Sequence, residues 1–295
     1  MKRAVLVFGI LALAACSEQP AGAPAMRARL DGKPVETAAP APAPSPSSAL
    51  ADAVSACRAA VFEDVPLTHC IADPAQHRIA MANAPAGGPP YGSLAAFAKT
   101  RDAAAIAFAM NGGAYGDNLK ALGYYVEGGE RLSEFNRGDA PEGNTSNFFM
   151  KPNGVFFGTG GAWRVLSTEA FYARVADRPE FGTQSGPMLV IEGKLHPEIQ
   201  DNGPSRAIRN GVGVDAKGMA HFVISDAPIS FGQLARFFRD ELKTPNALYL
   251  DGKVSALWDP ARGRLDQARN GPIVVVTKRE GAQSEGRKSE GAGAP

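Results

Sequence analysis

GVGVDAKGMAHFVIS, residues 211–225, contains two apolar stretches on either side of the turn Ala216-Lys217-Gly218. Two such stretches joined by a short turn with glycine are typical of a β-hairpin, whose strands run antiparallel. Similar turns occur at residues 127–130, 152–154 and 192–194. Strands are expected at residues 78–82, 104–110, 123–126, 147–150, 155–158, 187–191, 211–215, 220–225, 247–250 and 273–277.

An amphipathic helix is expected shortly after this hairpin. Residues 231–242 carry apolar side chains at helical spacing, and Ser230 with Gln233 forms a capping box at the start. Shorter helices are expected at residues 93–99 and 169–176. Hairpins combined with separate helices indicate an α+β fold, a single domain of mixed or antiparallel sheet with a few flanking helices.

The N-terminal residues have the composition of a lipoprotein signal peptide. Lys2 and Arg3 precede an apolar run at residues 4–15, shorter than the roughly 20 apolar residues of a transmembrane helix. The run leads through Leu-Ala-Ala into Cys16, which resembles the lipobox read by lipoprotein signal peptidase. We therefore expect lipidation of Cys16 and a periplasm-facing anchor in the cell envelope. Ser17 at the next position favours the outer membrane.

The rest of the chain divides by composition. The residues after Cys16 are rich in Ala and Pro, as expected of an extended tether. The C-terminal residues are rich in Gly, Glu, Lys and Ser, as in disordered tails. The stretch between is long enough for one domain with a full core. The predicted organisation is a signal peptide at residues 1–15, a tether at 16–51, a domain at 52–278 and a tail at 279–295.

The charged residues and histidines argue against several kinds of partner. The net charge is +1, so there is no basic excess for binding nucleic acid, and membrane attachment is expected to come from the lipid. The four histidines are scattered and have no metal-ligand spacing. We therefore expect neither a metal nor a cofactor. The sequence leaves the oligomeric state open.

Cys57 and Cys70 remain as a pair once Cys16 carries lipid. In an oxidising compartment a disulfide is the natural interpretation, and closing a loop of this length stabilises a fold by about 3 kcal/mol. The alternative is a reactive thiol.

Two familiar motifs do not fit their structural context. Gly211, Gly213 and Ala216 have the spacing of a dinucleotide fingerprint, but a turn and a strand follow where the fingerprint needs a helix. Ser185 lacks the glycine two residues earlier that a nucleophile elbow requires, which disfavours a serine hydrolase.

Polar residues beside small ones recur at the ends of apolar strands. Alone, each is more often a turn than a site, because Asn-Gly and Asp-Gly favour positive φ for local reasons. Their recurrence favours a shared site. The segments are Asn111-Gly112-Gly113, Lys151-Pro152-Asn153-Gly154, Gln184-Ser185-Gly186-Pro187, Ser205-Arg206 and Leu250-Asp251-Gly252.

These segments resemble those of the phosphodiester glycosidases, the domain shared by the uncovering enzyme of lysosomal-enzyme sorting and many bacterial exported proteins. The resemblance covers nearly all of residues 56–277, and its motifs occur in the family's order. They are FAMNGGAYG (108–116), NFFMKPNGVFF (147–157), TQSGPMLVIEGK (183–194), SRAIRNGVGVD (205–215) and NALYLDGKVSALW (246–258).

The resemblance implies hydrolysis of a sugar joined through its anomeric carbon to a phosphodiester. Arg206, helped by Arg209 or Lys151, is suited to hold the phosphodiester charge. Backbone amides at glycines are suited to an anion nest, because glycine lets the chain approach closely. Those amides are expected from Asn111, Gly112, Gly113, Ser185 and Gly186, and hydrogen bonds to sugar hydroxyls from Asn111, Asn153 and Gln184.

Asp251 is the expected catalytic carboxylate, acting as nucleophile or as general base for water, and Arg206 is the second expected catalytic residue. Gly252, which forms a turn with Asp251, is expected to contribute to substrate binding. A phosphate leaving group is a weak base, so one carboxylate suffices where glycosidases usually need two. The alternative is that Asp251 only caps a turn. Asp226, Glu192 and Asp117 are lesser candidates for a second acid. Two other functions remain open, a non-catalytic glycan-binding module and a structural envelope lipoprotein on the same fold.

Overall fold

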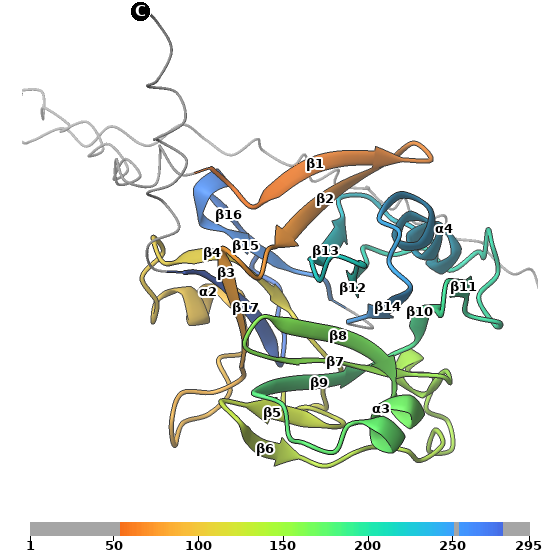
Figure 1. Ribbon diagram of the computed structural model, residues 1–295, viewed down its shortest axis with the longest axis horizontal. Coiled ribbons are helices and arrows are strands. Elements are labelled where there is room, and N and C mark those ends of the chain that lie inside the picture. Colours follow the sequence, from red (N-terminus) through yellow and green to blue (C-terminus); the bar gives the residue numbers. More distant parts are fainter. Residues whose placement is uncertain (1–53, 251–253, 280–295) are drawn as a thin grey trace, which may run out of the picture. The chain divides into compact units, whose positions relative to one another are not determined.

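The computed structural model describes residues 54–250 and 254–279 (Figure 1). The predicted signal peptide, the tether with Cys16, and the tail after Arg279 lie outside the described residues. Among the described helices, none is long and apolar enough to cross a membrane.

The described residues form three antiparallel sheets with short helices, so the predicted α+β fold is confirmed. The first sheet has the order β1 (Cys57–Phe62), β2 (Val65–Ala72), β13 (Ala220–Ser225), β12 (Asn210–Val214), β14 (Asn246–Tyr249), β10 (Met188–Ile191) and β11 (Lys194–Leu195). The second has the order β16 (Arg264–Leu265), β15 (Leu257–Asp259), β4 (Ile106–Asn111), β17 (Ile273–Lys278) and β3 (His77–Ala82). The third has the order β6 (Glu130–Ser133), β5 (Tyr125–Glu127), β9 (Phe181–Ser185), β7 (Gly154–Thr159) and β8 (Ala162–Ser167).

Short helices lie between the strands. They are α2 (Leu94–Ala98), α3 (Thr168–Arg174) and α4 (Phe231–Arg236), with the 3₁₀ turns η1 (Asn147–Phe149) and η3 (Pro260–Arg262). A π-helical turn, η2 (Phe237–Glu241), continues α4. The helix predicted at residues 231–242 is therefore present, as an α-helical segment followed by a π-helical one. The predicted capping box of Ser230 and Gln233 begins it.

The strand predicted at residues 147–150 is wrong. These residues form η1, because the Ser146 hydroxyl accepts from the Phe148 amide and caps a 3₁₀ turn. An apolar run this short does not distinguish a strand from a turn of helix.

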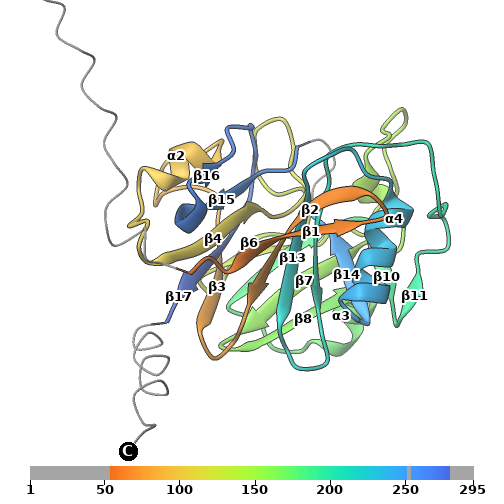
Figure 2. The ribbon, with the colours of Figure 1, turned by 90° about the horizontal axis from the view of Figure 1, so that it is seen from above.

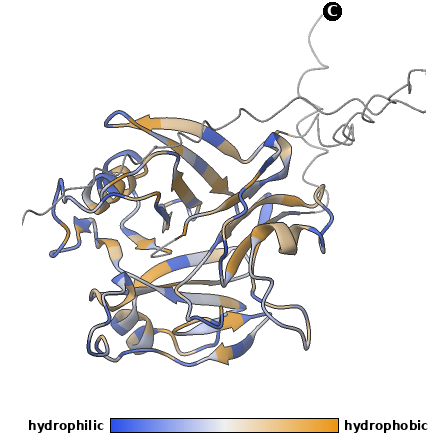
Figure 3. Cartoon of the chain, turned by 180° about the vertical axis from the view of Figure 1, so that it is seen from behind, coloured by the Kyte–Doolittle hydropathy of each residue, from blue (hydrophilic) through white to orange (hydrophobic). Residues whose placement is uncertain are grey.

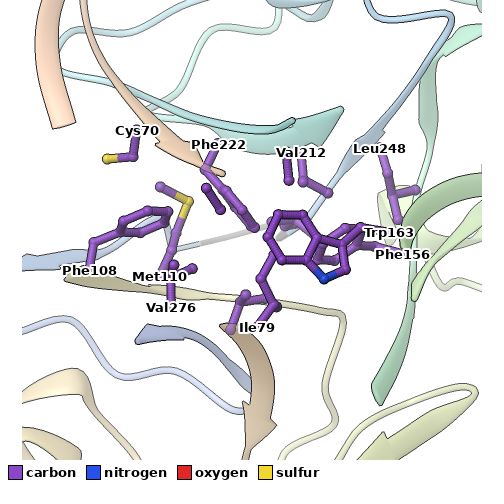
Figure 4. Close-up of a cluster of buried hydrophobic side chains, with 14 of the residues drawn as sticks. Cys70, Ile79, Phe108, Met110, Phe156, Trp163, Val212, Phe222, Leu248 and Val276 are labelled. Atoms are coloured by element: carbon purple, nitrogen blue, oxygen red, sulfur yellow. The ribbon is translucent and has the colours of Figure 1, made fainter. Parts of the chain in front are cut away.

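One core joins the three sheets. Phe222 of the first sheet packs edge-on against Phe108 of the second and Phe156 of the third, with ring centroids 5.3 and 5.6 Å apart (Figure 4). All three rings are fully buried. Burying such a side chain contributes about 1.5–3 kcal/mol, so this contact stabilises the packing of the three sheets against one another.

A second core lies on the other face of the first sheet, beneath α4 (Figure 2). Leu234 and Phe238 from this helix and its continuation pack with Val223 and Tyr249 of the sheet. In Figure 3 most strongly hydrophobic residues lie on strands and helices, whereas several connecting loops are hydrophilic.

The predicted disulfide is present. Cys57 and Cys70 lie directly opposite one another on β1 and β2 and are joined through their sulfurs. The bond closes the hairpin at the start of the described chain.

Candidate functional site

Four strands from the three sheets have neighbouring ends. The second sheet contributes the end of β4 at Asn111, and the third the end of β9 at Ser185. The first sheet contributes the start of β12 at Asn210 and the end of β14 at Tyr249, which lie at one edge because these strands run antiparallel. The bonds between these residues define the candidate site.

Asn111 and Asn210 form the centre of this arrangement, and both are buried. The Asn210 Nδ2 group donates to the main-chain oxygen and to Oδ1 of Asn111, over 3.0 Å each. Asn111 Oδ1 also accepts from the Ala256 amide at 2.7 Å, and Asn111 Nδ2 donates to the Val254 carbonyl at 2.7 Å. The Asn111 side chain therefore holds Val254 and Ala256 in place.

Ser185 and Asn210 hold Leu250, the residue that follows β14. The Ser185 hydroxyl donates to the Leu250 carbonyl over 3.0 Å, and the Leu250 amide donates to the Asn210 carbonyl over 3.3 Å. Asp251 and Gly252, predicted as catalytic and binding residues, lie outside the described residues. Leu250 and Val254 are thus fixed by the side chains of Ser185 and Asn111 and by the main-chain carbonyl of Asn210, which come from three sequence motifs.

Gln184 and Asn153 use their amides inside the protein. Gln184 Oε1 accepts from the amides of Tyr124 and Asn136, and its Nε2 donates to the Thr168 hydroxyl. Asn153 Oδ1 accepts from the same Thr168 hydroxyl over 2.8 Å. Because both side chains are buried, they fix the loops around them. Their binding of sugar hydroxyls stays a prediction.

The glycines of the motifs permit close packing. A Cβ on Gly186 would lie 2.7 Å from Asn153 Cβ and 2.9 Å from the Phe148 carbonyl oxygen, so only glycine fits. Gly113 has a φ of 146°, which side chains rarely adopt, and a Cβ there would clash with the Thr183 hydroxyl.

Part of the predicted anion nest already has acceptors within the protein. The Asn111 amide donates to the Ala256 carbonyl over 3.3 Å, and the Gly112 amide donates to the Pro272 carbonyl over 2.8 Å. Both bonds belong to the contacts of β4 with its neighbours. Anion binding by the other predicted amides stays a prediction.

The three predicted cations differ in exposure. Arg209 is 2% exposed, stacks on the Phe231 ring at 3.7 Å, and donates to the Ile229 carbonyl and the Tyr249 hydroxyl. Arg206 is exposed, and its Nη1 donates to Gln233 Oε1 over 2.6 Å. Arg206 is therefore accessible to a ligand, whereas Arg209 supports the end of β14 from within.

Lys151 is also exposed, and its Nζ lies 2.6 Å from Asp139 Oδ1. The motif that contains Lys151 and the motif that contains Arg206 both contribute to a small pocket of about 140 Å³. Met150 and Ser205, their direct chain neighbours, both line this pocket together with Phe231.

Sequence reasoning missed Asn210, Thr168 and Thr183. Thr183 donates its hydroxyl to the Gly112 carbonyl over 2.8 Å and so joins the third sheet to the second. Asn210 stands in the motif that suggested Arg206, and its position at a strand start next to a glycine was the available signal. Asp226, a lesser acid candidate, instead pairs with Arg264 at 2.8 Å.

The strand-end motifs that resemble those of the phosphodiester glycosidases meet where the ends of strands from the three sheets adjoin. The chain belongs to the phosphodiester glycosidase family, whose model matches residues 104–278.

A curated relative is uncharacterized protein YigE of Escherichia coli strain K12. It is 34% identical over 187 residues, which cover 63% of this chain and 71% of the relative. A similar solved structure is the catalytic domain of zebrafish N-acetylglucosamine-1-phosphodiester alpha-N-acetylglucosaminidase, auto-inhibited by its pro-peptide. The TM-score is 0.51 at 14% identity, over 76% of this chain and 82% of that one, so this likeness concerns the fold.

Proposed function

We propose that this protein hydrolyses the bond between the anomeric carbon of a sugar and a phosphodiester. The family supports a hydrolytic role. The observation that carries the proposal is the fixing of Leu250 and Val254 by Ser185, Asn210 and Asn111. These bonds hold the chain on either side of Asp251, the carboxylate that the sequence assigns to catalysis.

Asp251 acts in this proposal as nucleophile at the anomeric carbon or as general base for water. The leaving phosphate is a weak base and needs little protonation, so a single carboxylate is sufficient. Arg206 is exposed, and its chain neighbour Ser205 lines a pocket together with Phe231. The Arg206 guanidinium suits the single negative charge of the phosphodiester.

The test is hydrolysis of a panel of α-linked sugar 1-phosphodiesters, including the N-acetylglucosamine compound, by the purified protein. Asp251→Asn is expected to lower kcat by about 100-fold or more, because it removes the acting carboxylate. Arg206→Ala is expected mainly to raise KM. Arg239→Ala and Asp240→Asn are matched controls, since these residues form a partly exposed ion pair with each other on η2.

Two outcomes would contradict the proposal. Unchanged turnover in Asp251→Asn removes this residue from catalysis. Sugar binding without product on any member of the panel favours a non-catalytic glycan-binding module instead.

We further propose that the protein acts in the cell envelope, anchored through lipid on Cys16 and facing the periplasm, with the outer membrane as the expected site. The support is the signal-peptide composition of the N-terminal sequence. A disulfide between Cys57 and Cys70 fits an oxidising compartment.

A further inference from the structure

A buried glutamine, Gln233, holds the guanidinium of the exposed Arg206. Gln233 is the third residue of α4, and its side chain is almost fully enclosed, with 6% of the residue exposed. Its Oε1 accepts from Arg206 Nη1 over 2.6 Å. Charge-assisted hydrogen bonds are shorter and stronger than neutral ones, and this length is typical of them. A buried amide therefore sets the direction of an exposed cation.

The capping box of α4 immobilises the same amide. Gln233 Oε1 also accepts from the Ser230 amide over 3.3 Å, and the Gln233 main-chain amide donates to the Ser230 hydroxyl over 3.2 Å. Ser230 is fully buried. Because the capping box fixes the Gln233 side chain, the oxygen that faces Arg206 is fixed as well.

The other end of the Gln233 amide faces a carboxylate. Glu63, in the turn between β1 and β2, accepts from Arg236 Nε and Nη2 over 2.8 and 2.7 Å. The pKa of the Glu63 carboxyl lies below its ordinary value, first because of the Arg236 bond and to a smaller extent because the Gln233 side chain also donates to it. Gln233 thus turns its NH₂ group toward Glu63 and its oxygen toward Arg206.

The positive charge of Arg206 is not neutralised by this arrangement. Among the described ion pairs, none includes Arg206, whereas Lys151 pairs with Asp139 at 2.6 Å. The described bond to Gln233 uses one of the five N–H donors of the guanidinium. The remaining donors and the full charge are left for a ligand.

The loop that carries Arg206 is held against the same helix. A Cβ on Gly232 would clash with the Asp201 carbonyl oxygen, to which Arg236 Nη1 donates over 2.8 Å. At the other end of the loop, Ala207 and Ile229 exchange two main-chain hydrogen bonds of 3.3 and 2.9 Å. Arg206 is therefore largely ordered before any ligand arrives, which reduces the entropy cost of binding.

We propose that Gln233 is a positioning residue, whose oxygen directs the Arg206 guanidinium toward the phosphate group of the substrate and whose neutrality leaves the guanidinium charge for that group. The inference rests on the proposed function, because Arg206 is the residue assigned there to the phosphodiester. A glutamate at this position would complete a capping box equally well. Its carboxylate, however, would pair with Arg206 and oppose Glu63.

The test is calorimetric titration of the purified full chain with the sugar 1-phosphodiesters of the hydrolysis panel. The methyl glycosides of the same sugars are the matched uncharged probes. Gln233→Glu is expected to weaken phosphodiester binding about tenfold or more, because its carboxylate neutralises Arg206. Binding of the uncharged probes is expected to change less than about twofold. For a compound that is hydrolysed, KM is expected to rise more than kcat falls.

Gln233→Met is the second variant, because it removes the oxygen without adding a charge beside Glu63. It is expected to weaken phosphodiester binding about threefold or more, since Arg206 is no longer directed. Asn202→Asp is the charge-matched control at an exposed position of the same loop, and its effect is expected to stay below about twofold. Thermal unfolding checks that each variant is folded.

A double-mutant cycle separates positioning from a purely structural role. In the Arg206→Ala background, Gln233→Glu and Gln233→Met are each expected to change phosphodiester binding by less than about twofold, because no guanidinium remains to be directed or neutralised.

Three outcomes would overturn the inference. They are an undiminished loss in the Arg206→Ala background, an equal loss of the uncharged probes, and absence of phosphodiester binding by the unaltered chain. Binding of phosphodiesters without hydrolysis of any of them would instead contradict the proposed function, and the cycle would still decide the role of Gln233 in binding.

Discussion

The Asn210 side chain donates hydrogen bonds to two oxygens of Asn111, joining the first sheet to the second at the candidate site. Asn210 is also bonded through its carbonyl to the Leu250 amide. The two residues lie 99 positions apart in the chain, and both are buried. Asn210 thus supports Asn111 through its side-chain amide and the end of the described chain at Leu250 through its main-chain carbonyl.

Asn210→Ala is expected to destabilise the protein by about 1–3 kcal/mol, because it leaves buried oxygens of Asn111 without these donors. If the proposed hydrolysis holds, kcat should fall more than KM rises, since Asn111, which holds Val254 and Ala256, loses its side-chain donor. Urea unfolding and steady-state kinetics measure the two effects. Asn202→Ala, at an exposed position, is the control. Full stability in Asn210→Ala would contradict the anchoring role.

Phe222→Ala is expected to cost about 3–5 kcal/mol, since it removes the ring that packs against both Phe108 and Phe156. Val61→Ala, at a side chain that is 72% exposed, is expected to stay within about 0.5 kcal/mol of the unaltered protein. Denaturant unfolding measures both. Similar losses in the two variants would contradict a core shared by the three sheets.

Stability is expected to fall as pH is lowered below 6.5, partly because of His69. Its ring lies 2.9 Å from His221 through Nε2 and Nδ1, and burial, then the nearby His221 and Arg58, lowers its pKa to about 3. Between these pH values the unfolded chain binds a proton that the folded chain does not, so unfolding becomes more favourable as pH falls.

His69→Gln is expected to reduce the slope of unfolding free energy against pH between 6.5 and about 5, where carboxylates remain mostly ionised. A smaller slope should remain, because burial also lowers the pKa of His77 and His196. Urea titrations at several pH values measure it. An unchanged slope would show that His69 titrates alike in both states.

Cys16→Ser is expected to move the protein from the membrane fraction to the soluble fraction, because a serine cannot carry the thioether-linked lipid. Fractionation of cells followed by immunodetection measures this. Cys57→Ser, which breaks the disulfide and spares the lipobox, is the control. Retention of Cys16→Ser in the membrane fraction would contradict the lipid anchor.

The sequence alone determined the local features. The turn at residues 216–218 and the apolar stretches around it specified a hairpin, and Ser230 with Gln233 specified a helix start. Such features depend on neighbours within a few residues, so periodicity and turn chemistry reveal them. The motifs also identified the family, which the comparison with its model confirmed.

Only the tertiary structure decided which polar side chains meet. Ser185 and Leu250 lie 65 positions apart, and their contact follows from how separate sheets pack around Phe222. The sequence did not distinguish the buried Arg209 from the exposed Arg206, although both lie in one motif. Burial and long-range hydrogen bonds are set by packing between distant strands, and no local pattern of residues records that packing.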